Sequence, residues 1–309
     1  MLPVDLEFED VYDELLHLDP YGERTARVLR ETLDQLYDGQ HTGRYKWEQL
    51  HKTEKTHCGT LVEINLHREF QFDDGARLDY AVRGIDVDCK YSQKLGKWMI
   101  PSEAFGELCL VVTADDRAST WSSGLVRAEE RILSGGRNRD SKANLSKEGL
   151  GSVRWFHRGA KLPPNVLLDL SEDDQTAIFG ESSGQRRVDE LFRRAQGRRV
   201  GRGVVATVAQ QADYMKRVRG NGGSRSRLQP EGIVILGDSS AHQKIAQELD
   251  IEVPMSGESV AVRVVPAGMD WDGPAFEADD ALWRQATLSD PLHRGPNMKN
   301  PRVAHPSNQ

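Results

Sequence analysis

The chain has 309 residues, 38% of them hydrophobic, so it can supply a core to each of two domains, and its formal charge of -7 is unlike that of a uniformly basic nucleic-acid binder. Three scattered cysteines exclude a disulfide framework or a zinc cluster. The sequence has no long apolar run and an acidic start, MLPVDLEFEDVYDELL, so we expect a cytoplasmic protein with no membrane partner.

The first forty residues predict two helices. Apolar residues recur at helical spacing from 10 to 37, and the pattern breaks at LDPYGE, where Pro20 and Gly22 interrupt it. The segment HTGRYKWEQLHKTEKTH then reads as a polar connection that carries lysines. The helical period resumes in GTLVEINLHREF, which places Glu63 inside a helix.

Residues 77–92, RLDYAVRGIDVDCKYS, predict a two-stranded hairpin with apolar residues alternating on both sides of Gly84. One face is apolar, and the opposite face carries Asp79, Asp88 and Lys90. Next, GELCLVVTA at 106–114 is almost continuously apolar, as in a strand buried on both faces. A helix, a hairpin and a buried strand in this order favour an α/β core.

A domain boundary is predicted where helix-breaking residues gather. The segment HRGAKLPPN combines Gly with two prolines, so we expect a first domain at 1–157, a linker at 158–165 and a second domain at 166–309. In the second domain RRVDELFRRA predicts an amphipathic helix, and IVILG and VAVRVVP predict strands. From Gly268 the chain turns polar and rich in proline, so we expect the last twenty-odd residues to be poorly ordered.

The pattern (D/E)xK occurs twice, and context separates the two cases. Asp140 and Lys142 lie in a polar loop where nothing fixes one side chain relative to the other. Asp88 and Lys90 lie in a strand, where a spacing of two puts both groups on one face, and the hairpin brings Asp79 beside them.

Three carboxylates beside one lysine suit metal-assisted hydrolysis of phosphodiesters. Mg²⁺ prefers hard oxygen ligands and keeps several waters, so Glu63, Asp79 and Asp88 could hold it together with substrate phosphate oxygens. An ammonium such as that of Lys90 can orient the attacking water and stabilise developing charge. The alternative is that these carboxylates are structural and only form salt bridges. His67, four residues after Glu63, is interpreted as a surface or core histidine.

Charge is segregated along the chain. Residues 1–40 hold eleven Asp or Glu against three Arg, whereas residues 181–230 hold twelve Lys or Arg against four Asp or Glu. This distribution is explained either by ordinary solvated faces or by a basic surface for DNA phosphates. Under the second hypothesis the candidate DNA-binding residues are Lys52, Lys55, Arg193, Arg194, Arg198, Arg199, Lys216, Arg217, Arg219, Arg225 and Arg227.

Several long segments resemble the type II restriction endonucleases of the NaeI family. The likeness runs from Leu18 to Pro266 and is carried by LDPYGERTARVLRETLDQLYDGQ, QLHKTEKTH, GTLVEINLHREFQFDDG, VDCKYS, VDELFRRA, VVATVAQQADYMKRVRGNGGSRS and PEGIVILG. The resemblance implies an N-terminal endonuclease core of the PD-(D/E)xK type and a C-terminal DNA-binding domain with a helix-turn-helix like that of catabolite activator protein.

Carried over by position, the family's catalytic acids fall on Glu63, Asp79 and Asp88, and its catalytic lysine falls on Lys90. The sequence departs from the usual motif in having Leu78 rather than Pro before Asp79. The resemblance further implies Mg²⁺ as cofactor and a homodimer that engages two DNA duplexes, one as substrate and one as effector. It also implies blunt cleavage of the palindrome GCCGGC.

Two other functions remain open from the residues alone. A sequence-specific DNA-binding regulator would share the basic C-terminal region and cleave nothing, and a repair or nicking nuclease would share the metal site and open one strand.

Overall fold

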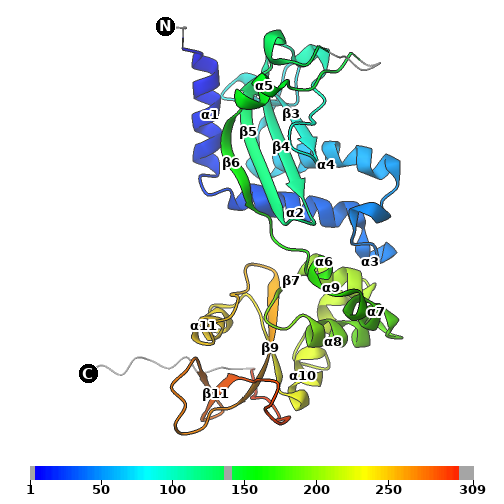
Figure 1. The fold of residues 1–309 in the computed structure, drawn as a ribbon, viewed down its shortest axis with the longest axis vertical. Coiled ribbons are helices and arrows are strands. Elements are labelled where there is room, and N and C mark those ends of the chain that lie inside the picture. Colours follow the sequence, from blue (N-terminus) through cyan, green and yellow to red (C-terminus); the bar gives the residue numbers. More distant parts are fainter. Residues whose placement is uncertain (1–3, 136–140, 299–309) are drawn as a thin grey trace, which may run out of the picture. The chain divides into compact units, whose positions relative to one another are not determined.

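The computed structural model describes residues 4–135 and 141–298 (Figure 1). These residues form two compact units. The first comprises the described residues up to Tyr37 together with Trp47–Pro164, and the second comprises Asp38–Lys46 together with the described residues from Asn165 onward. Within the described ranges, no helix has the length and apolar content needed to cross a bilayer.

The first unit is a mixed sheet with helices packed on it. Its helices are α1 (Leu6–Leu18), α2 (Glu23–Tyr37), α4 (Lys52–Phe70) and α5 (Lys147–Gly151), with short 3-10 turns at Trp47–Gln49, Ser102–Ala104 and Glu130–Ile132. Its strands are β1 (Asp73–Asp74), β2 (Tyr80–Val82), β3 (Ile85–Ser92), β4 (Leu108–Asp115), β5 (Thr120–Arg127) and β6 (Arg154–Lys161). A mixed α/β architecture is therefore confirmed.

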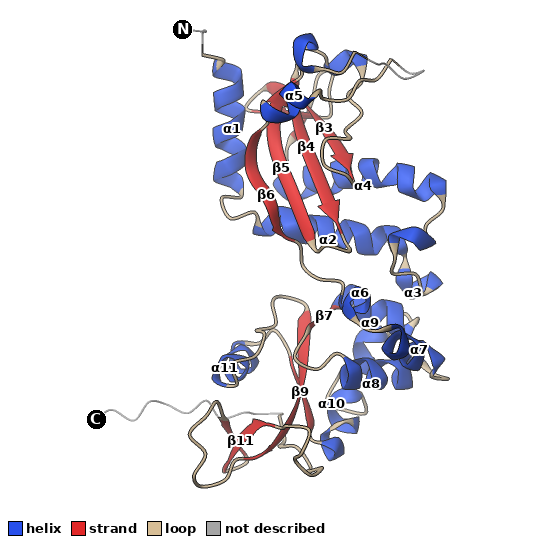
Figure 2. Cartoon of the chain, viewed as in Figure 1, coloured by secondary structure: helices blue, strands red, loops and turns tan. Residues whose placement is uncertain are grey.

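Among the described residues of this unit, the strands form one sheet in chain order from β1 to β6. Only β3 and β4 run parallel, and β4 is buried along nearly its whole length, as its apolar run predicts. Figure 2 shows β3 to β6 side by side, with α2 and α4 crossing the sheet. The sheet therefore supplies a rigid base for the side chains of β3.

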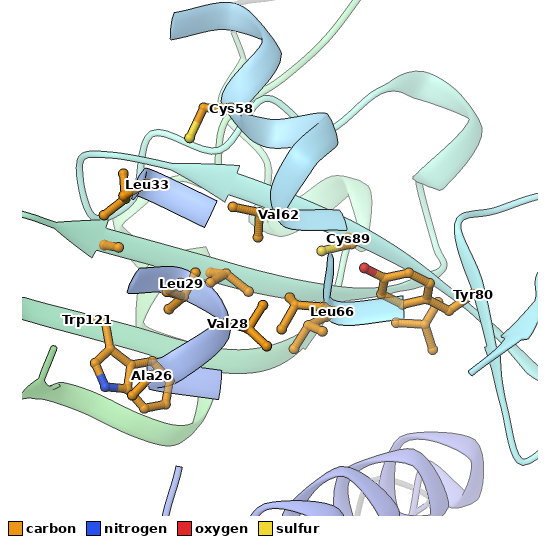
Figure 3. Packing of buried hydrophobic residues seen from close by; sticks show 14 of the residues in the cluster. Ala26, Val28, Leu29, Leu33, Cys58, Val62, Leu66, Tyr80, Cys89 and Trp121 are labelled. Atoms are coloured by element: carbon orange, nitrogen blue, oxygen red, sulfur yellow. The ribbon is translucent and has the colours of Figure 1, made fainter. Parts of the chain in front are cut away.

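One hydrophobic core lies between the sheet and helices α2 and α4. Figure 3 shows Leu29, Val62 and Leu66 of the helices packed towards Tyr80 and Cys89 of the hairpin. Each of these side chains is at most 4% exposed, and burying a large apolar side chain contributes about 1.5–3 kcal/mol. This core fixes where α4 sits against β2 and β3.

The predicted hairpin is confirmed as β2 and β3. It turns at Arg83 and Gly84, whose φ angles of 52° and 78° are the left-handed values that a tight two-residue hairpin turn requires. The register sets Tyr80 opposite Val87, and both point into the core between sheet and helices. Asp88 and Lys90, one residue out of phase, therefore lie on the opposite face.

The two predicted N-terminal helices are confirmed as α1 and α2, but the polar connection after them is shorter than expected. Helix α4 already begins at Lys52, so KTEKTH is helical and His51 is its N-cap. The signal is a capping box, in which the side chain of His51 accepts from the amide of Glu54 and the Glu54 carboxylate accepts from the amide of His51. A polar stretch with a good cap can thus begin a helix before its apolar period starts.

The predicted linker at 158–165 is partly wrong, because strand β6 runs through Lys161. Gly159 does not end the strand. It adopts φ of 65°, a value that glycine tolerates, and its amide donates to the Ser122 hydroxyl of β5 at 2.9 Å. The two strands β5 and β6 carry no strict alternation in the sequence and were not predicted.

The second unit combines short helices with a branched sheet. Its helices are α3 (Gly39–Thr42), α6 (Val166–Asp169), α7 (Glu172–Gly180), α8 (Gly184–Arg194), α9 (Arg202–Ala209), α10 (Ser224–Arg227) and α11 (Ser240–Glu248), with 3-10 turns at Tyr214–Arg217 and Gln229–Glu231. Its strands are β7 (Arg199–Gly201), β8 (Ile233–Leu236), β9 (Glu258–Pro266), β10 (Phe276–Ala278) and β11 (Ala281–Gln285). The predicted helix and both predicted strands are confirmed as α8, β8 and β9.

The segment Asp38–Lys46 lies in the second unit although its neighbours in the chain belong to the first. Gly39 packs so closely on α9 that a Cβ atom there would lie 2.0 Å from the Thr207 hydroxyl oxygen. Tyr45 stacks on Phe179 with ring centroids 5.4 Å apart, and its carbonyl accepts from the Asn165 amide. The local sequence does not indicate that this segment belongs to the second unit, because the contacts join residues more than a hundred positions apart.

The last twenty-odd residues, predicted to be poorly ordered, are described only as far as Met298, and their described part has no helix or strand. Strands β10 and β11 follow Gly268, and the Gln229 side chain donates to the carbonyls of Gly295 and Pro296, at 3.1 Å each. These backbone contacts hold the proline-rich segment without regular structure. Residues 299–309 lie outside the described residues, as does Asp140.

A buried ionic network joins α2 to the turn between β4 and β5. Asp116 pairs with Arg30 and accepts a hydrogen bond of 2.7 Å from the Tyr37 hydroxyl, and the Asp116 side chain is only 4% exposed. Arg30 also pairs with Asp34 at 2.8 Å. The network anchors the helix that forms one wall of the core.

We predict that Asp116→Ala lowers the free energy of unfolding by about 3–5 kcal/mol, because it leaves the buried Arg30 guanidinium short of its partner. The control is Glu9→Ala, which breaks the exposed Glu9–Arg154 pair and should cost about 0–1 kcal/mol. Urea unfolding followed by circular dichroism measures both. Equal losses in the two variants would contradict the anchoring role.

Candidate active site

Two charged residues of β3 form the centre of the candidate site. The ammonium nitrogen of Lys90 lies 2.7 Å from Asp88 Oδ1, and the Asp88 side chain is 4% exposed. The neighbouring strand places Cys109 beside Asp88, with its sulfur 3.9 Å from Oδ2. Because both charged groups stand on one rigid strand, their separation is fixed by the pleat.

Asp79 reaches the same lysine from just outside β2. Its Oδ2 lies 3.2 Å from the Lys90 ammonium nitrogen and accepts the Cys89 amide at 2.7 Å. The aspartate side chain thus takes a backbone donor of β3 at the point where regular β2 pairing has ended. As a result Asp79, Asp88 and Lys90 converge as the hairpin pattern predicts.

The loop that aims Asp79 is itself held in place. Asp86 accepts from the amides of Ala76 and Arg77, at 2.8 and 3.0 Å. A Cβ atom on Gly75 would lie 2.3 Å from the Leu78 carbonyl oxygen, so only glycine permits this close turn. Leu78, which replaces the family's usual proline, is half-buried against a second apolar cluster.

Helix α4 brings Glu63 towards this site. The hydroxyl of Tyr80 donates to the Glu63 carbonyl oxygen at 2.7 Å, which ties the helix to β2. His67, one turn further along, lies 3.2 Å from Asp74 and against the Tyr80 ring. Its placement matches the interpretation of a structural histidine.

The four charged groups influence one another strongly. Burial raises the pKa of Asp88 to about 7, although Lys90 opposes the change. Burial and the charge of Asp79 raise the pKa of Glu63, against the opposing charges of Lys90 and His67. Burial disfavours the charged form of Lys90, but Asp88 and Asp79 outweigh this and raise its pKa. The lysine of this site therefore stays charged, and two of its carboxyl groups keep their protons to a higher pH than isolated carboxyl groups do.

This donor set fits a hard divalent cation. Three carboxylates and one ammonium leave a formal excess of two negative charges, and burial, with the charge of Asp79 as a smaller cause, raises the pKa of two of the acids. In the described part of the chain, no three His, Cys, Asp or Glu side chains form a ready metal cage. Mg²⁺ does not need one, because it keeps waters and uses substrate oxygens.

Comparisons with known proteins decide the family. The family model described as Restriction endonuclease NaeI matches residues 9–294, which extends the predicted likeness at both ends and covers most of both units. A curated relative, the type II restriction enzyme NaeI of Lentzea aerocolonigenes, is 51% identical over 300 residues, covering 94% of each chain. The chain belongs to the restriction endonuclease NaeI family.

Most of the arginines predicted to bind DNA already have partners in this NaeI-family chain. Each of the following contacts an acidic side chain or a backbone carbonyl: Arg193, Arg194, Arg198, Arg199, Arg217 and Arg227. Arg193, for example, lies 2.8 Å from Glu231. Such pairs lower the local positive charge. The number of arginines in the sequence therefore overestimates the positive charge of this surface.

Other predicted basic residues are more available. Arg219 is exposed and has no acidic partner among the described residues, and Lys216 is 65% exposed with Asp213 only at 3.9 Å. Lys52 is exposed at the start of α4, one turn before the half-buried Lys55. Arg225 differs from all of these because its guanidinium lines a cavity.

Sequence reasoning missed three residues that position the site in this NaeI-family chain. Tyr80 and Cys109 were interpreted only as apolar residues of strands, whereas they contact Glu63 and Asp88. Asp86, on the charged side of the hairpin pattern, holds the loop before Asp79. Only the hydroxyl of Tyr80, a polar group within an apolar alternation, is a usable signal.

We predict that Asp88→Asn stabilises the metal-free protein more at about pH 8 than at about pH 5, by on the order of 2 kcal/mol. The pKa of Asp88 in the folded protein, about 7, lies above that of an unfolded aspartate. Between these two values the folded state alone keeps the proton, so wild-type stability falls as the pH rises towards the folded value and the variant escapes this loss.

Urea unfolding in EDTA at both pH values measures the difference. Asp73→Asn, on the exposed strand β1, is the matched control and should show no such dependence. A difference between Asp88→Asn and wild type that does not change with pH would contradict the raised pKa.

Proposed function

We propose that this member of the restriction endonuclease NaeI family is a Mg²⁺-dependent type II deoxyribonuclease that cuts both strands of double-stranded DNA at a palindromic site. Glu63, Asp79 and Asp88 are the proposed metal ligands, and Lys90 is the proposed catalytic lysine. The observation that carries the proposal is the convergence of Asp79 and Asp88 on the Lys90 ammonium. The family membership supplies the substrate class.

The chemistry required of the chain is modest. When bound, Mg²⁺ lowers the pKa of a water ligand and offsets charge on the phosphodiester. Lys90, kept protonated by its two carboxylate neighbours, can orient the attacking water and stabilise the developing negative charge. Asp88 and Asp79 hold that ammonium within 3.2 Å, so it needs no reorganisation when the substrate arrives.

The arrangement supports the PD-(D/E)xK type of core. An acidic residue outside a short strand, an acid and a lysine two residues apart on the next strand, and an acid on a helix packed against them are its elements. Here they are Asp79, Asp88 with Lys90, and Glu63. Leu78 in place of proline leaves Asp79 correctly aimed because Asp86 and Gly75 hold the loop.

The second unit supports a helix-turn-helix DNA-binding role. Helix α9 ends at Gln210 with φ of 51°, and the chain then turns through Tyr214–Arg217 into α10. In the sheet of this unit, strand β9 pairs with both β7 and β8. The available cations Lys216 and Arg219 lie in the turn itself, where contacts to DNA phosphates would position the duplex.

We further propose a homodimer in the cytoplasm that engages two duplexes, one as substrate and one as effector. Two active sites related by a two-fold axis match the two strands of a palindrome. GCCGGC, cut to blunt ends, is the proposed site because of the family membership. Separate nuclease and DNA-binding units in one chain give each duplex its own unit.

The central test is digestion of a long, fully sequenced phage DNA with purified protein in Mg²⁺ and in EDTA, with the fragment ends sequenced. We predict discrete fragments only in Mg²⁺, all ending at one palindrome. Absence of cutting, even with short duplexes added as effector, would favour a DNA-binding regulator. Nicks in one strand alone would favour a repair or nicking nuclease.

We predict that Lys90→Ala reduces the cleavage rate by at least about a hundredfold, since it removes the group that orients water, while duplex binding in Ca²⁺ stays measurable. Lys142→Ala, in the second (D/E)xK pattern, is the matched control and should cut like wild type. The comparison uses single-turnover cleavage of a duplex that contains the mapped site. Cutting by Lys90→Ala at the wild-type rate would show that the assigned site is wrong.

We predict that the double variant Lys216→Ala, Arg219→Ala weakens duplex binding and reduces the slope of log affinity against log salt by about two, one for each lost phosphate contact. Arg194→Ala, whose charge is already paired with Glu190 and Asp174, is the control and should leave the slope unchanged. Fluorescence anisotropy in EDTA at several salt concentrations measures both. Equal slopes for all three proteins would remove this turn from the DNA interface.

A further inference from the structure

The second unit contains a cavity of about 1030 Å³ that the proposed cleavage and DNA-binding turn do not use. Residues from α10, β8, the first turn of α11 and the segment 293–298 line it. Apolar side chains of β8, with Trp283 and Met298, form part of the wall. Cationic or polar groups form another part: Arg225, Ser239, His242 and Arg294. The lining thus places two arginines in a partly apolar cavity.

Arg225 is the chemically unusual group in this lining. Its Nε atom is buried, and among the described residues its guanidinium makes no hydrogen bond or ion pair. Burial lowers the pKa of this guanidinium, and Asp238 compensates only in part. A buried guanidinium nitrogen without a hydrogen-bond acceptor is unfavourable unless something else supplies one.

The backbone holds Arg225 in this place. The guanidinium passes so close to Gly237 that a Cβ atom there would lie 2.6 Å from Arg225 Nη2. Gly237 is also the residue that connects β8 to the loop before α11, and its amide donates to His242 Nδ1 at 3.0 Å. A glycine at this point therefore lets the cation approach the start of α11.

The start of α11 adds donors beside the cation. Its N-cap, Ser239, accepts from the amide of His242 at 3.4 Å, and both residues line the cavity. Amides in the first turn of a helix point outward and carry partial positive charge. His242 has a lowered pKa because of burial and the neighbouring Arg225, so it contributes a neutral ring and no competing anion.

We propose that this cavity binds a phosphate group, with the Arg225 guanidinium and the first-turn amides of α11 that precede His242 as its donors. A guanidinium fork and helix amides match phosphate oxygens in geometry as well as charge. Arg294, exposed at the edge and bonded to Gln229 at 3.2 Å, adds a second positive charge. The acid in the lining, Asp279, already accepts the Asn297 amide at 2.7 Å and so has a partner of its own.

The phosphate can come from a DNA backbone or from a free phosphate compound, and both sources share the same donors. The DNA source rests on the proposed function and deepens it, since it would add a second anchor for the duplex. A free phosphate ligand is independent of cleavage. Binding is therefore measured without catalysis, in EDTA, so that loss of nuclease activity and loss of the phosphate site are separate results.

The experiment uses the full chain and inorganic phosphate as the probe. Thermal unfolding is followed against phosphate concentration, with chloride replacing phosphate at constant ionic strength. The wild type should show a saturable rise in melting temperature. Arg225→Gln should weaken phosphate binding at least about tenfold, the loss expected for charge-assisted hydrogen bonds, while Lys244→Gln, which removes a cation of α11 that does not line the cavity, should bind like wild type.

A third variant protects the test against misfolding. Arg225→Lys keeps the charge and loses the fork, so it should bind phosphate with intermediate affinity, and near-ultraviolet circular dichroism checks that all variants are folded. Duplex anisotropy then separates the sources. If Arg225→Gln weakens duplex binding more than Lys244→Gln and phosphate competes with the duplex, the ligand is the DNA backbone. If duplex binding is unaffected, the ligand is a free phosphate.

The proposal is overturned if phosphate does no more than chloride to wild-type stability and folded Arg225→Gln binds duplex as Lys244→Gln does. It is equally overturned if folded Arg225→Gln keeps the full phosphate response.

Discussion

The first unit depends on one lysine shared between two aspartates in a largely buried site. Lys90 and Asp88 stand on a strand that pairs with β4 on one side, and on the other side the Asp79 carboxylate accepts the Cys89 amide between them, so the backbone fixes both residues. Burying any one of these charges alone is unfavourable, and a neighbouring opposite charge offsets that cost. The surrounding fold holds these charged groups together. The core packs under the hairpin, and the hydrogen bond from Tyr80 holds α4 in place.

The same constraint explains why the hairpin is irregular where it matters. If β2 continued in register beyond Tyr80, Asp79 would pair with Asp88, and its carboxylate would stand out from the sheet on the same face instead of accepting the in-plane amide of Cys89. The strand instead ends, and a loop closed by Gly75 and Asp86 turns the aspartate towards the edge of β3. The local irregularity thus lets Asp79 accept a backbone donor as well as the Lys90 ammonium.

Sequence reasoning succeeded where periodicity and chemistry agree. The alternation around Gly84 predicted both the hairpin and the face that carries Asp88 and Lys90, and the spacing in RRVDELFRRA predicted the buried face of α8. It failed where long-range pairing decides the structure. Strand β6 owes its length to β5, and the arginines of α8 are neutralised by acids as distant as Glu231. No local pattern records such partners.

The detour of Asp38–Lys46 has a consequence for how such proteins can evolve. The second unit is built from two stretches of chain, and Gly39 and Tyr45 are integral to its packing. A single recombination event after the first unit would deliver an incomplete second unit with an uncovered α9. Exchange of the second unit between relatives therefore requires both stretches to move together, which favours gradual divergence of the whole chain over modular shuffling.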